Sequence, residues 1–287
     1  MKTGFFFDKE VDTSQLDLIV RKNNLNMIGF WCKDSLNSTN PLLYSNEDEL
    51  LEKVEVAVLF LNGSSYFELA SKALKSGINL FLTSLPDYTY QALITLNELS
   101  LEIGRQIGFG CSGTDLVKPG EIINNYFMIQ MIRDAGVETD DETFRRMLVY
   151  DIASFVRLKP CSLRKMRVNG VPLFNKSPKA FNLRLEYDNS GIIAYSLTRV
   201  NGPKRCHFRF FSGDDGHFND LPVDHVHLDP KVLANPLALL NDNDFVKGLQ
   251  GFLSELSHNQ RASFNIDNAL ETFGFIKTVE ERLYPVN

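Results

Sequence analysis

The sequence lacks a long apolar run and lacks cysteines at paired spacing. Its four cysteines are far apart, at Cys32, Cys111, Cys161 and Cys206. Scattered single thiols are typical of a reducing compartment, and their spacing excludes a compact cysteine metal site. No apolar stretch approaches the ~20 residues of a membrane span, and the apolar run near the N-terminus is too short for a signal peptide. We therefore expect a cytoplasmic protein with no membrane partner.

An excess of positive charge is also missing. The 287 residues carry 36 acidic and 30 basic side chains, a formal net charge of −6. A nucleic-acid-binding domain usually has a basic stripe, so this balance argues against a nucleic-acid partner. Hydrophobic residues make up 44% of the chain, which is enough for a packed core. The length suggests one large domain or two of ordinary size.

Apolar strands alternate with amphipathic helices through the first 110 residues. Continuous apolar strands of this kind indicate a parallel sheet covered by helices on both faces. The predicted strands are Thr3–Phe7, Met27–Cys32, Val56–Leu61, Ile78–Leu82 and Gln106–Gly110, and the predicted helices are Gln15–Lys22, Ser45–Leu51, Ser65–Gly77 and Thr89–Ile103.

Strands dominate after a linker candidate at Cys111–Gly120. Turn-forming residues at Asn169-Gly170, Asp188–Gly191 and Asn201–Pro203 favour antiparallel pairing. The predicted strands are Ile122–Ile132, Leu163–Phe174, Ala180–Tyr187, Ile192–Val200 and Cys206–Phe211, and the predicted helices are Thr143–Leu158, Asp244–Ser257 and Asn268–Leu283. We predict an α/β plus α+β protein. A Rossmann-like domain spans residues 1–112, and a mostly antiparallel domain with helices on one face spans 113–287, its last helix packing back on the first domain.

The first strand–helix–strand unit has the layout of a nucleotide-binding unit without its glycines. A dinucleotide site needs G-x-G-x-x-G at the first strand-to-helix turn, where backbone N–H groups contact the pyrophosphate. The turn here is Phe-Asp-Lys-Glu-Val-Asp, residues 7–12. Asp12, with Gln15 three residues later, forms a capping pattern. We therefore expect a self-capped helix end rather than a phosphate site.

The order of these elements resembles the Gfo/Idh/MocA family of glucose–fructose oxidoreductase and inositol dehydrogenase-like proteins. Residues 44–51, 54–61 and 68–77 are similar to the second half of that family's nucleotide-binding fold. Residues 150–156 resemble its helix after the domain junction, and residues 181–191 its substrate-domain hairpin. The resemblance covers nearly the whole chain and implies a two-domain NAD(P)-dependent oxidoreductase fold.

The family's functional residues are mostly replaced here. By the resemblance, the cofactor positions form a degenerate cleft of Phe7, Asp8, Lys9, Asp12, Cys32, Asn62, Gly63 and Tyr66. Cys32 stands where the family has its ribose-binding acid. The catalytic positions correspond to Leu85, Pro86, Leu148 and Asp151. Leucine cannot titrate, whereas hydride transfer from an alcohol needs a base. We therefore assign no catalytic or cofactor-binding residue and expect no cofactor, with NAD(P) as the alternative.

Asp151 and the tyrosines near the predicted sheet edge are further candidates. A half-buried Asp151 needs a partner, such as an arginine or a backbone N–H group, and could line a cleft. Tyr66, Tyr88 and Tyr90 could fill the empty cofactor crevice, although aromatic residues there are more often packing groups.

Three late histidines form the remaining constellation. His225 and His227 lie on one face of an extended segment, with His217 nearby and several aspartates close in sequence. Such a set could bind zinc, but a solvated polar loop before Pro230 is the better explanation. We expect no metal.

Three functions remain open. The first is a non-catalytic relative that binds an unknown small molecule or protein. The second is an NAD(P)-dependent oxidoreductase with non-standard cofactor contacts, acting on a sugar or cyclic polyol. The third is a structural subunit, a homo-oligomer that assembles through the flat face of the C-terminal sheet.

Overall fold

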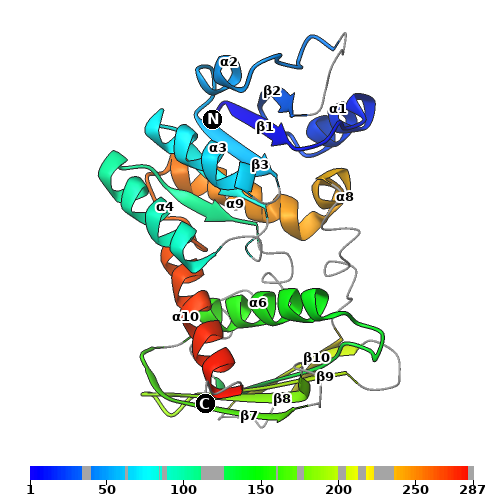
Figure 1. Ribbon diagram of the computed structural model, residues 1–287, viewed down its shortest axis with the longest axis vertical. Helices are drawn as coiled ribbons and strands as arrows, with labels where there is room; N and C mark the ends of the chain where they lie inside the picture. The colour runs from blue at the N-terminus through cyan, green and yellow to red at the C-terminus, as the bar shows by residue number, and fades with distance from the viewer. Residues whose placement is uncertain are drawn as a thin grey trace. The chain divides into compact units, whose positions relative to one another are not determined.

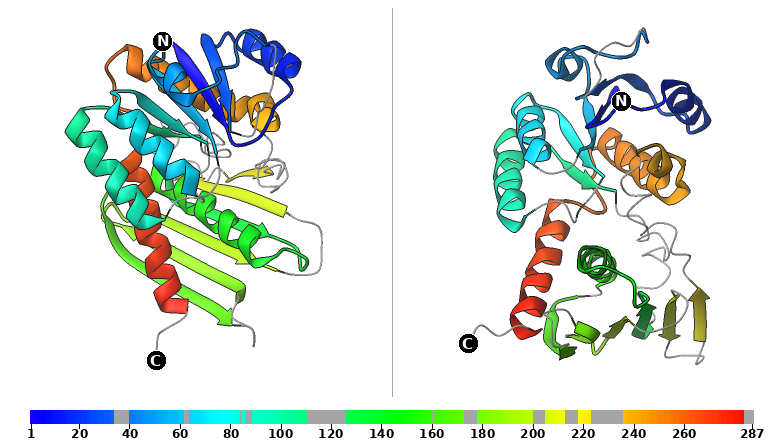
Figure 2. Two further views of the ribbon diagram at one scale, coloured as in Figure 1. Left: turned by 45° about the horizontal axis from the view of Figure 1, so that its top comes forward. Right: turned by 45° about the vertical axis from the view of Figure 1, so that its right-hand side comes forward.

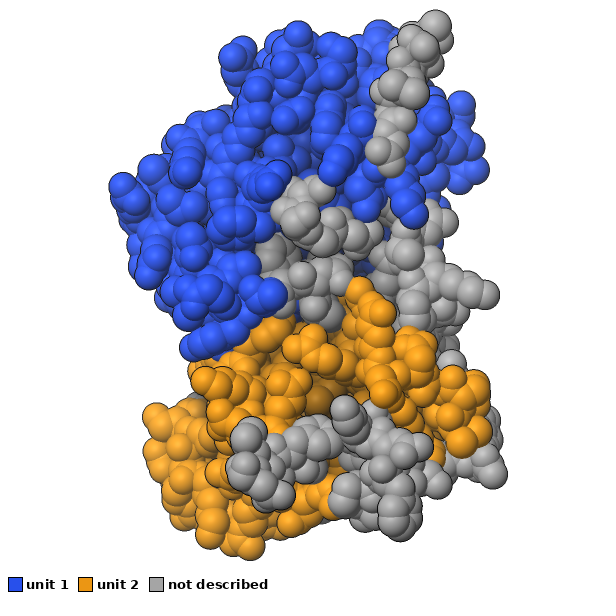
Figure 3. Space-filling model, viewed as in Figure 1, with its two compact units in different colours: residues 1–112, 231–270 blue, residues 113–230, 271–287 orange. Residues whose placement is uncertain are grey.

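The computed structural model describes residues 1–33, 40–61, 64–83, 85, 89–110, 126–159, 161–172, 178–199, 205–212, 218–222 and 236–283. Two units follow from the contacts between residues (Figure 3). Unit 1 comprises Met1–Ser112 and Lys231–Leu270, and unit 2 comprises Gly113–Pro230 and Glu271–Asn287. The linker candidate Cys111–Gly120 and the turn Asn201–Pro203 lie outside the described residues. No helix among the residues with described placement is both long and apolar enough to cross a membrane.

Unit 1 is built on a five-stranded parallel sheet with the strand order β2-β1-β3-β4-β5. Its strands are β1 (Thr3–Phe7), β2 (Met27–Cys32), β3 (Val56–Phe60), β4 (Asn79–Leu82) and β5 (Ile107–Phe109). Every residue of β1, β3, β4 and β5 is buried. The apolar runs that predicted a sheet covered on both faces are therefore confirmed.

Helices cover both faces of this sheet (Figure 1). Those that follow the first four strands are α1 (Thr13–Lys22), α2 (Glu47–Leu51), α3 (Ser64–Lys75) and α4 (Tyr90–Ile103). Helix α1 lies on one face with α8 (Pro236–Asn241) and α9 (Asn243–Ser257), whereas α2, α3 and α4 lie on the other.

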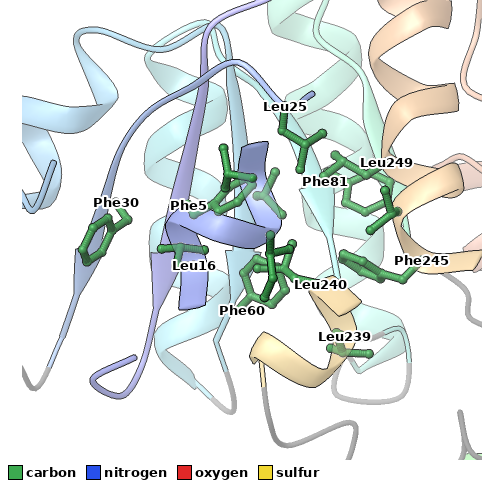
Figure 4. Packing of buried hydrophobic residues seen from close by; sticks show 14 of the residues in the cluster. Phe5, Leu16, Leu25, Phe30, Phe60, Phe81, Leu239, Leu240, Phe245 and Leu249 are labelled. Atoms are coloured by element: carbon green, nitrogen blue, oxygen red, sulfur yellow. The ribbon is translucent and has the colours of Figure 1, made fainter. Parts of the chain in front are cut away.

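Helices α8 and α9 come from the C-terminal part of the chain but pack on the first sheet. Leu239, Leu240, Phe245 and Leu249 belong to the same apolar cluster as β1 and β3 (Figure 4). A Cβ atom at Gly108 would lie 2.6 Å from the ring of Phe252, so the missing side chain lets α9 approach β5 closely. The sequence prediction placed 113–287 in one domain and missed α8, because a short apolar helix after a polar loop has too few turns for a clear period.

Unit 2 contains a six-stranded sheet with the order β11-β10-β6-β9-β8-β7. The strands are β6 (Tyr126–Asp134), β7 (Leu163–Pro172), β8 (Pro178–Tyr187), β9 (Ile192–Thr198), β10 (Arg205–Ser212) and β11 (Phe218–Pro222). All neighbours are antiparallel except β6 and β9, which are parallel, so the mostly antiparallel prediction is confirmed.

Two local predictions for this sheet were wrong. Asn169 and Gly170 form no turn; they pair with Asn182 and Phe181 inside β7. Asn-Gly is a strong turn signal, but here the neighbouring strand β8 continues past it, and pairing decides the conformation. β11 was also missed, because its sequence has no alternation of apolar and polar residues.

Helix α6 (Asp141–Leu158) covers one face of the second sheet, as Figure 2 shows. It is buried along nearly its whole length. The last helix, α10 (Ile266–Leu283), runs from residues of unit 1 into residues of unit 2. Within unit 2 its Glu271 pairs with Lys159 and its Glu280 with Arg145, both at or near α6.

Candidate functional site

Phe7 stands at the carboxyl end of β1, where the resemblance places the first fingerprint glycine. Its side chain is fully buried. The ring stacks on Phe60 at a centroid distance of 5.0 Å and meets Phe30 edge-on at 6.3 Å. Aromatic pairs in these geometries contribute about 0.5–1.5 kcal/mol beyond the area they bury. The position that should let a phosphate approach is therefore part of the apolar core.

Asp12 caps helix α1. Its Oδ1 accepts hydrogen bonds from the backbone N–H groups of Ser14 at 3.0 Å and Gln15 at 3.2 Å. The Gln15 side-chain amide donates to Oδ2 at 3.0 Å. These backbone donors are the ones a pyrophosphate would use at a helix N-terminus. The predicted capping of α1 by Asp12 is confirmed. Between Phe7 and Asp12, Lys9 is exposed and Asp8 partly so.

Cys32 ends β2 at the position of the ribose-binding acid. It pairs in parallel register with Phe7 and is 5% exposed. Burial raises the pKa of the Cys32 thiol to about 11, against the lowering effect of a hydrogen bond with the Val11 backbone. The side chain is thus a neutral thiol at physiological pH. A buried neutral thiol cannot act as the acceptor that a ribose diol requires.

Tyr66, on α3, is buried beside the carboxyl ends of β3 and β4. Its hydroxyl donates to the carbonyl oxygen of Leu59 at 2.8 Å and accepts from the backbone N–H of Thr83 at 3.1 Å. The Thr83 hydroxyl also donates to the Leu59 carbonyl oxygen, at 2.8 Å. Tyr66 is 1% exposed and Thr83 is 4% exposed. Polar groups at the carboxyl ends of β3 and β4 therefore hydrogen-bond to one another.

Leu85 lies just after β4 and is completely buried. By the resemblance it stands at the position of the catalytic lysine. Its neighbour Pro86 lies outside the described residues, as do Asn62 and Gly63. Tyr88, a further candidate for filling the crevice, is also outside them, whereas Tyr90 is 43% exposed at the start of α4. Of the three tyrosines, Tyr66 is the one that the structure places in the buried core.

One cavity of about 280 Å³ lies beside this cleft in unit 1. It is lined by Trp31, Lys33, Glu47, Leu61, Glu68, Leu69 and Lys72. Trp31 and Lys33 flank Cys32, and Leu61 follows β3, so the cavity is near the carboxyl edge of the sheet. Lys72 pairs with Asp48 at 2.6 Å and with Glu47 at 3.1 Å. The hydrogen bond to Asp48 is the main reason that the pKa of Lys72 is raised, which keeps its charge.

Asp151 belongs to a buried polar network in unit 2. Its carboxylate accepts hydrogen bonds from Arg133 Nε at 2.6 Å and Nη2 at 2.5 Å, and from the Tyr195 hydroxyl at 2.6 Å. The network joins α6 to β6 and β9. Asp151 is 2% exposed and Arg133 is 3% exposed. The arginine partner expected for Asp151 is thus Arg133, but the carboxylate lies in the core rather than on an open surface.

Burial and the mutual interactions of these groups shift their pKa values. Desolvation alone would lower the pKa of Arg133, but the adjacent Asp151 carboxylate outweighs it and raises that pKa. Burial, together with the Asp151 charge, raises the pKa of Tyr195 well above its ordinary value. Burial also raises the pKa of the neighbouring Cys206 thiol to about 12. Burial likewise raises the pKa of the Asp151 carboxyl above its ordinary value, although the Arg133 charge and the hydrogen bonds from Arg133 and Tyr195 oppose that rise.

Leu148 lies one turn before Asp151 on α6 and is 7% exposed. The catalytic histidine of the resembled family would stand there.

The zinc candidates His217, His225 and His227 lie outside the described residues. Within the residues that are described, no group of three or more metal-ligating side chains comes together.

Sequence reasoning missed Arg133, Tyr195, Thr83 and Trp31. The first three bind partners 18, 44 and 17 residues away, so no local spacing marks them. A signal existed for Arg133, since a charged residue within the apolar strand Tyr126–Asp134 needs a buried counter-charge. Trp31 gave no signal, because an aromatic residue in a strand usually packs.

No family model and no curated protein matches the sequence. Solved structures do match the fold. The UDP-N-acetylglucosamine 3-dehydrogenase of Acidithiobacillus ferrooxidans is 14% identical, with a TM-score of 0.70 over 98% of this chain and 96% of that one. A dehydrogenase from Clostridium difficile is 13% identical, with a TM-score of 0.71 over 98% and 99%. A putative NADPH-dependent oxidoreductase from Desulfitobacterium hafniense is 10% identical, with a TM-score of 0.67 over 98% and 96%.

These likenesses extend over both units and agree with the parallel sheet, the α6 layer and the mixed sheet described above. At such low identity they establish the fold and leave the chemistry to the residues of the site. The chain has the fold of the Gfo/Idh/MocA-type dehydrogenases, and the resemblance inferred from its sequence is confirmed at that level.

Proposed function

We propose that this chain is a non-catalytic relative of the dehydrogenases whose fold it shares, and that it binds a small molecule or a protein partner. The observation that carries the proposal is the Asp12 cap. Oδ1 accepts from two N–H groups at the start of α1, and its charge would repel a phosphate there.

The neighbouring positions support the same proposal. Phe7 and Leu85 are fully buried, and Cys32 is a neutral thiol. A productive site needs a pyrophosphate anchor, a ribose acceptor and a proton-transfer group. In this chain, each of the three described positions that correspond to these roles carries a side chain that cannot perform it.

A second candidate is an NAD(P)-dependent oxidoreductase with non-standard contacts, acting on a sugar or cyclic polyol. The cavity beside Trp31 favours it, because it combines an indole ring with Lys33 near the carboxyl ends of β2 and β3. The similar structures that are dehydrogenases agree with this alternative. Glu47 and Glu68 line the same cavity and oppose a phosphate.

Fluorescence of the single tryptophan separates the two candidates. Trp31 lines the cavity, so a bound NADH or NADPH would quench its emission and receive its excitation energy. We expect no saturable change in tryptophan fluorescence with NADH, NADPH, NAD⁺ or NADP⁺ at concentrations up to about 1 mM. A Kd of about 1 mM corresponds to a binding free energy of only about −4.1 kcal/mol. Free tryptophan in the same titration corrects for absorption by the nucleotide. A saturable energy-transfer signal would contradict the non-catalytic proposal and favour the oxidoreductase.

We further propose that copies of the chain associate through the part of the outer sheet face formed by β6 and β9, away from α6. Partly exposed Met128 of β6 pairs there with Ile192 of β9, and Ile132 pairs with Ser196. Light scattering should therefore give a mass above 32.6 kDa. A monomer at working concentration would contradict this assembly.

We also propose that the protein is located in the cytoplasm. Cys32, Cys161 and Cys206 are free thiols, which agrees with a reducing environment such as the cytoplasm.

A further inference from the structure

Four charged residues share the outer face of the edge strand β7 and its neighbour β8. Lys165 pairs with Glu186 and Arg167 pairs with Arg184 in the antiparallel register. Because side chains alternate along a strand, residues 184 and 186 point away from the face of Leu183 and Leu185, which are buried. Lys165, Arg167, Arg184 and Glu186 therefore lie on the side of the sheet opposite to those leucines.

Three guanidinium groups converge on the single carboxylate of Glu186. Arg184 Nε lies 3.0 Å from Oε1, Arg167 Nε lies 3.6 Å from Oε1, and Arg164 Nη2 lies 3.5 Å from Oε2. Glu186 is 11% exposed, whereas the arginine side chains are 47% to 57% exposed. The arginines thus cover the carboxylate and remain open to solvent themselves. We call Arg164, Arg167 and Arg184 the arginine cluster.

The charge of the arginine cluster is not balanced by its own carboxylate. One glutamate faces three arginines, with exposed Lys165 on the same face, in a chain whose net charge is −6. Arg167 directly opposite Arg184 is a like-charge cross-strand pair, which is unfavourable. Glu186 offsets this repulsion only in part, because its single charge is shared among three arginines.

We propose that the arginine cluster docks an acidic segment of a partner protein. Guanidinium forks match carboxylates in shape and hydrogen-bonding pattern, and Glu186 shows that this cluster already holds one carboxylate. Partner carboxylates bind the exposed sides of Arg167 and Arg184 and neutralise the excess charge. The cluster sits on strands, which hold its geometry more rigidly than a loop would.

The surroundings of the cluster favour a protein segment over a nucleic acid. Toward β9, the residues paired with Glu186 and Arg184 are Ile192 and Ala194. Asn182, the next outward residue of β8, pairs with Ser196, whose hydroxyl donates to Asn182 Oδ1 at 2.7 Å. None of these described neighbouring residues is aromatic, so they offer no ring on which a nucleic-acid base could stack.

Fluorescence anisotropy with a labelled hexaglutamate peptide tests the proposal on the full chain. We expect saturable binding at 20 mM salt that weakens severalfold at 150 mM salt, because the contacts are exposed and screened. Arg167→Gln with Arg184→Gln should weaken binding by at least about tenfold. The matched control, Arg21→Gln with Lys22→Gln, removes the same charge from the exposed end of α1 and should change binding by less than about twofold.

Glu186→Gln gives the sharpest readout. Removing the internal competitor should tighten peptide binding about threefold or more, although the same change removes three ion pairs. Equal binding by wild type and the double arginine variant, or weaker binding after Glu186→Gln, would overturn the proposal. A mixed-sequence single-stranded DNA of equal charge that binds more tightly than the peptide would also overturn it. The inference does not depend on whether unit 1 binds a dinucleotide.

Discussion

The two units differ in the charge of the side chains that they bury at the positions compared with the dehydrogenases. At the carboxyl edge of the first sheet, Phe7, Cys32 and Leu85 are buried apolar or neutral side chains. In the core of unit 2, Asp151 keeps a hydrogen-bonded ion pair with Arg133. The described positions that correspond by resemblance to cofactor contacts are thus apolar or neutral in the first region, whereas a charged, hydrogen-bonded pair is buried in the second.

The largest expected effect comes from breaking the network of unit 2. Asp151→Ala leaves Arg133 buried without its counter-charge, and removal of one partner of a buried ion pair costs about 3–5 kcal/mol. Urea unfolding followed by circular dichroism measures the loss. The control Glu280→Ala breaks the exposed pair with Arg145 and should cost at most about 1 kcal/mol. Similar losses in both variants would contradict a structural role for the buried pair.

Tyr66 tests whether the first cleft is held by internal hydrogen bonds. Tyr66→Phe removes a hydroxyl that bonds the Leu59 carbonyl and the Thr83 N–H while keeping the ring. The Leu59 carbonyl keeps the Thr83 hydroxyl as a donor at 2.8 Å, so the expected loss is that of an ordinary hydrogen bond, about 0.5–1.5 kcal/mol. Thermal and urea unfolding should both show a destabilised variant. Unchanged stability would mean that water replaces the hydroxyl, and that the cleft is open to solvent.

The buried thiol of Cys206 makes stability depend on alkaline pH. Its pKa is raised by burial from 9.0 to about 12, so the unfolded chain releases the thiol proton first. The stabilising contribution is complete below pH 9 and is lost as the pH rises toward 12, at about 1.4 kcal/mol per pH unit. Urea unfolding at pH 8, 9 and 10 should show a shallower decline in Cys206→Ala than in wild type. Parallel declines would refute the raised pKa.

The Asp12 cap should give the smallest effect on stability. Asp12→Ala removes the acceptor for the N–H groups of Ser14 and Gln15, which costs about 1 kcal/mol. Thr89→Ala, which removes the cap of α4 that accepts from Ala92, is the matched control. Both variants should lose stability equally in urea unfolding. A more stable Asp12→Ala would show that the aspartate is strained at this position.

Much of the architecture was predictable from the sequence, because apolar periods and caps are local signals. The buried β1 and β3, the Asp12 cap and the Thr89 start of α4 follow from neighbouring residues. The packing of α9 on the first sheet and the partners of Asp151 did not follow, since they join residues far apart in the chain. The turn predicted at Asn169-Gly170 was wrong for the same reason. Pairing with the distant residues of β8 outweighs the local turn propensity of this dipeptide.

The amide resonances of Ser14 and Gln15 test the central claim most directly. Both N–H groups donate to Asp12, so a pyrophosphate that entered the site would displace the carboxylate and shift both signals. In a titration of ¹⁵N-labelled protein with NADPH and with NADH, we expect these two resonances to stay fixed, as should that of Ala92 at the cap of α4. A saturable shift of Ser14 and Gln15 that leaves Ala92 unchanged would contradict the account.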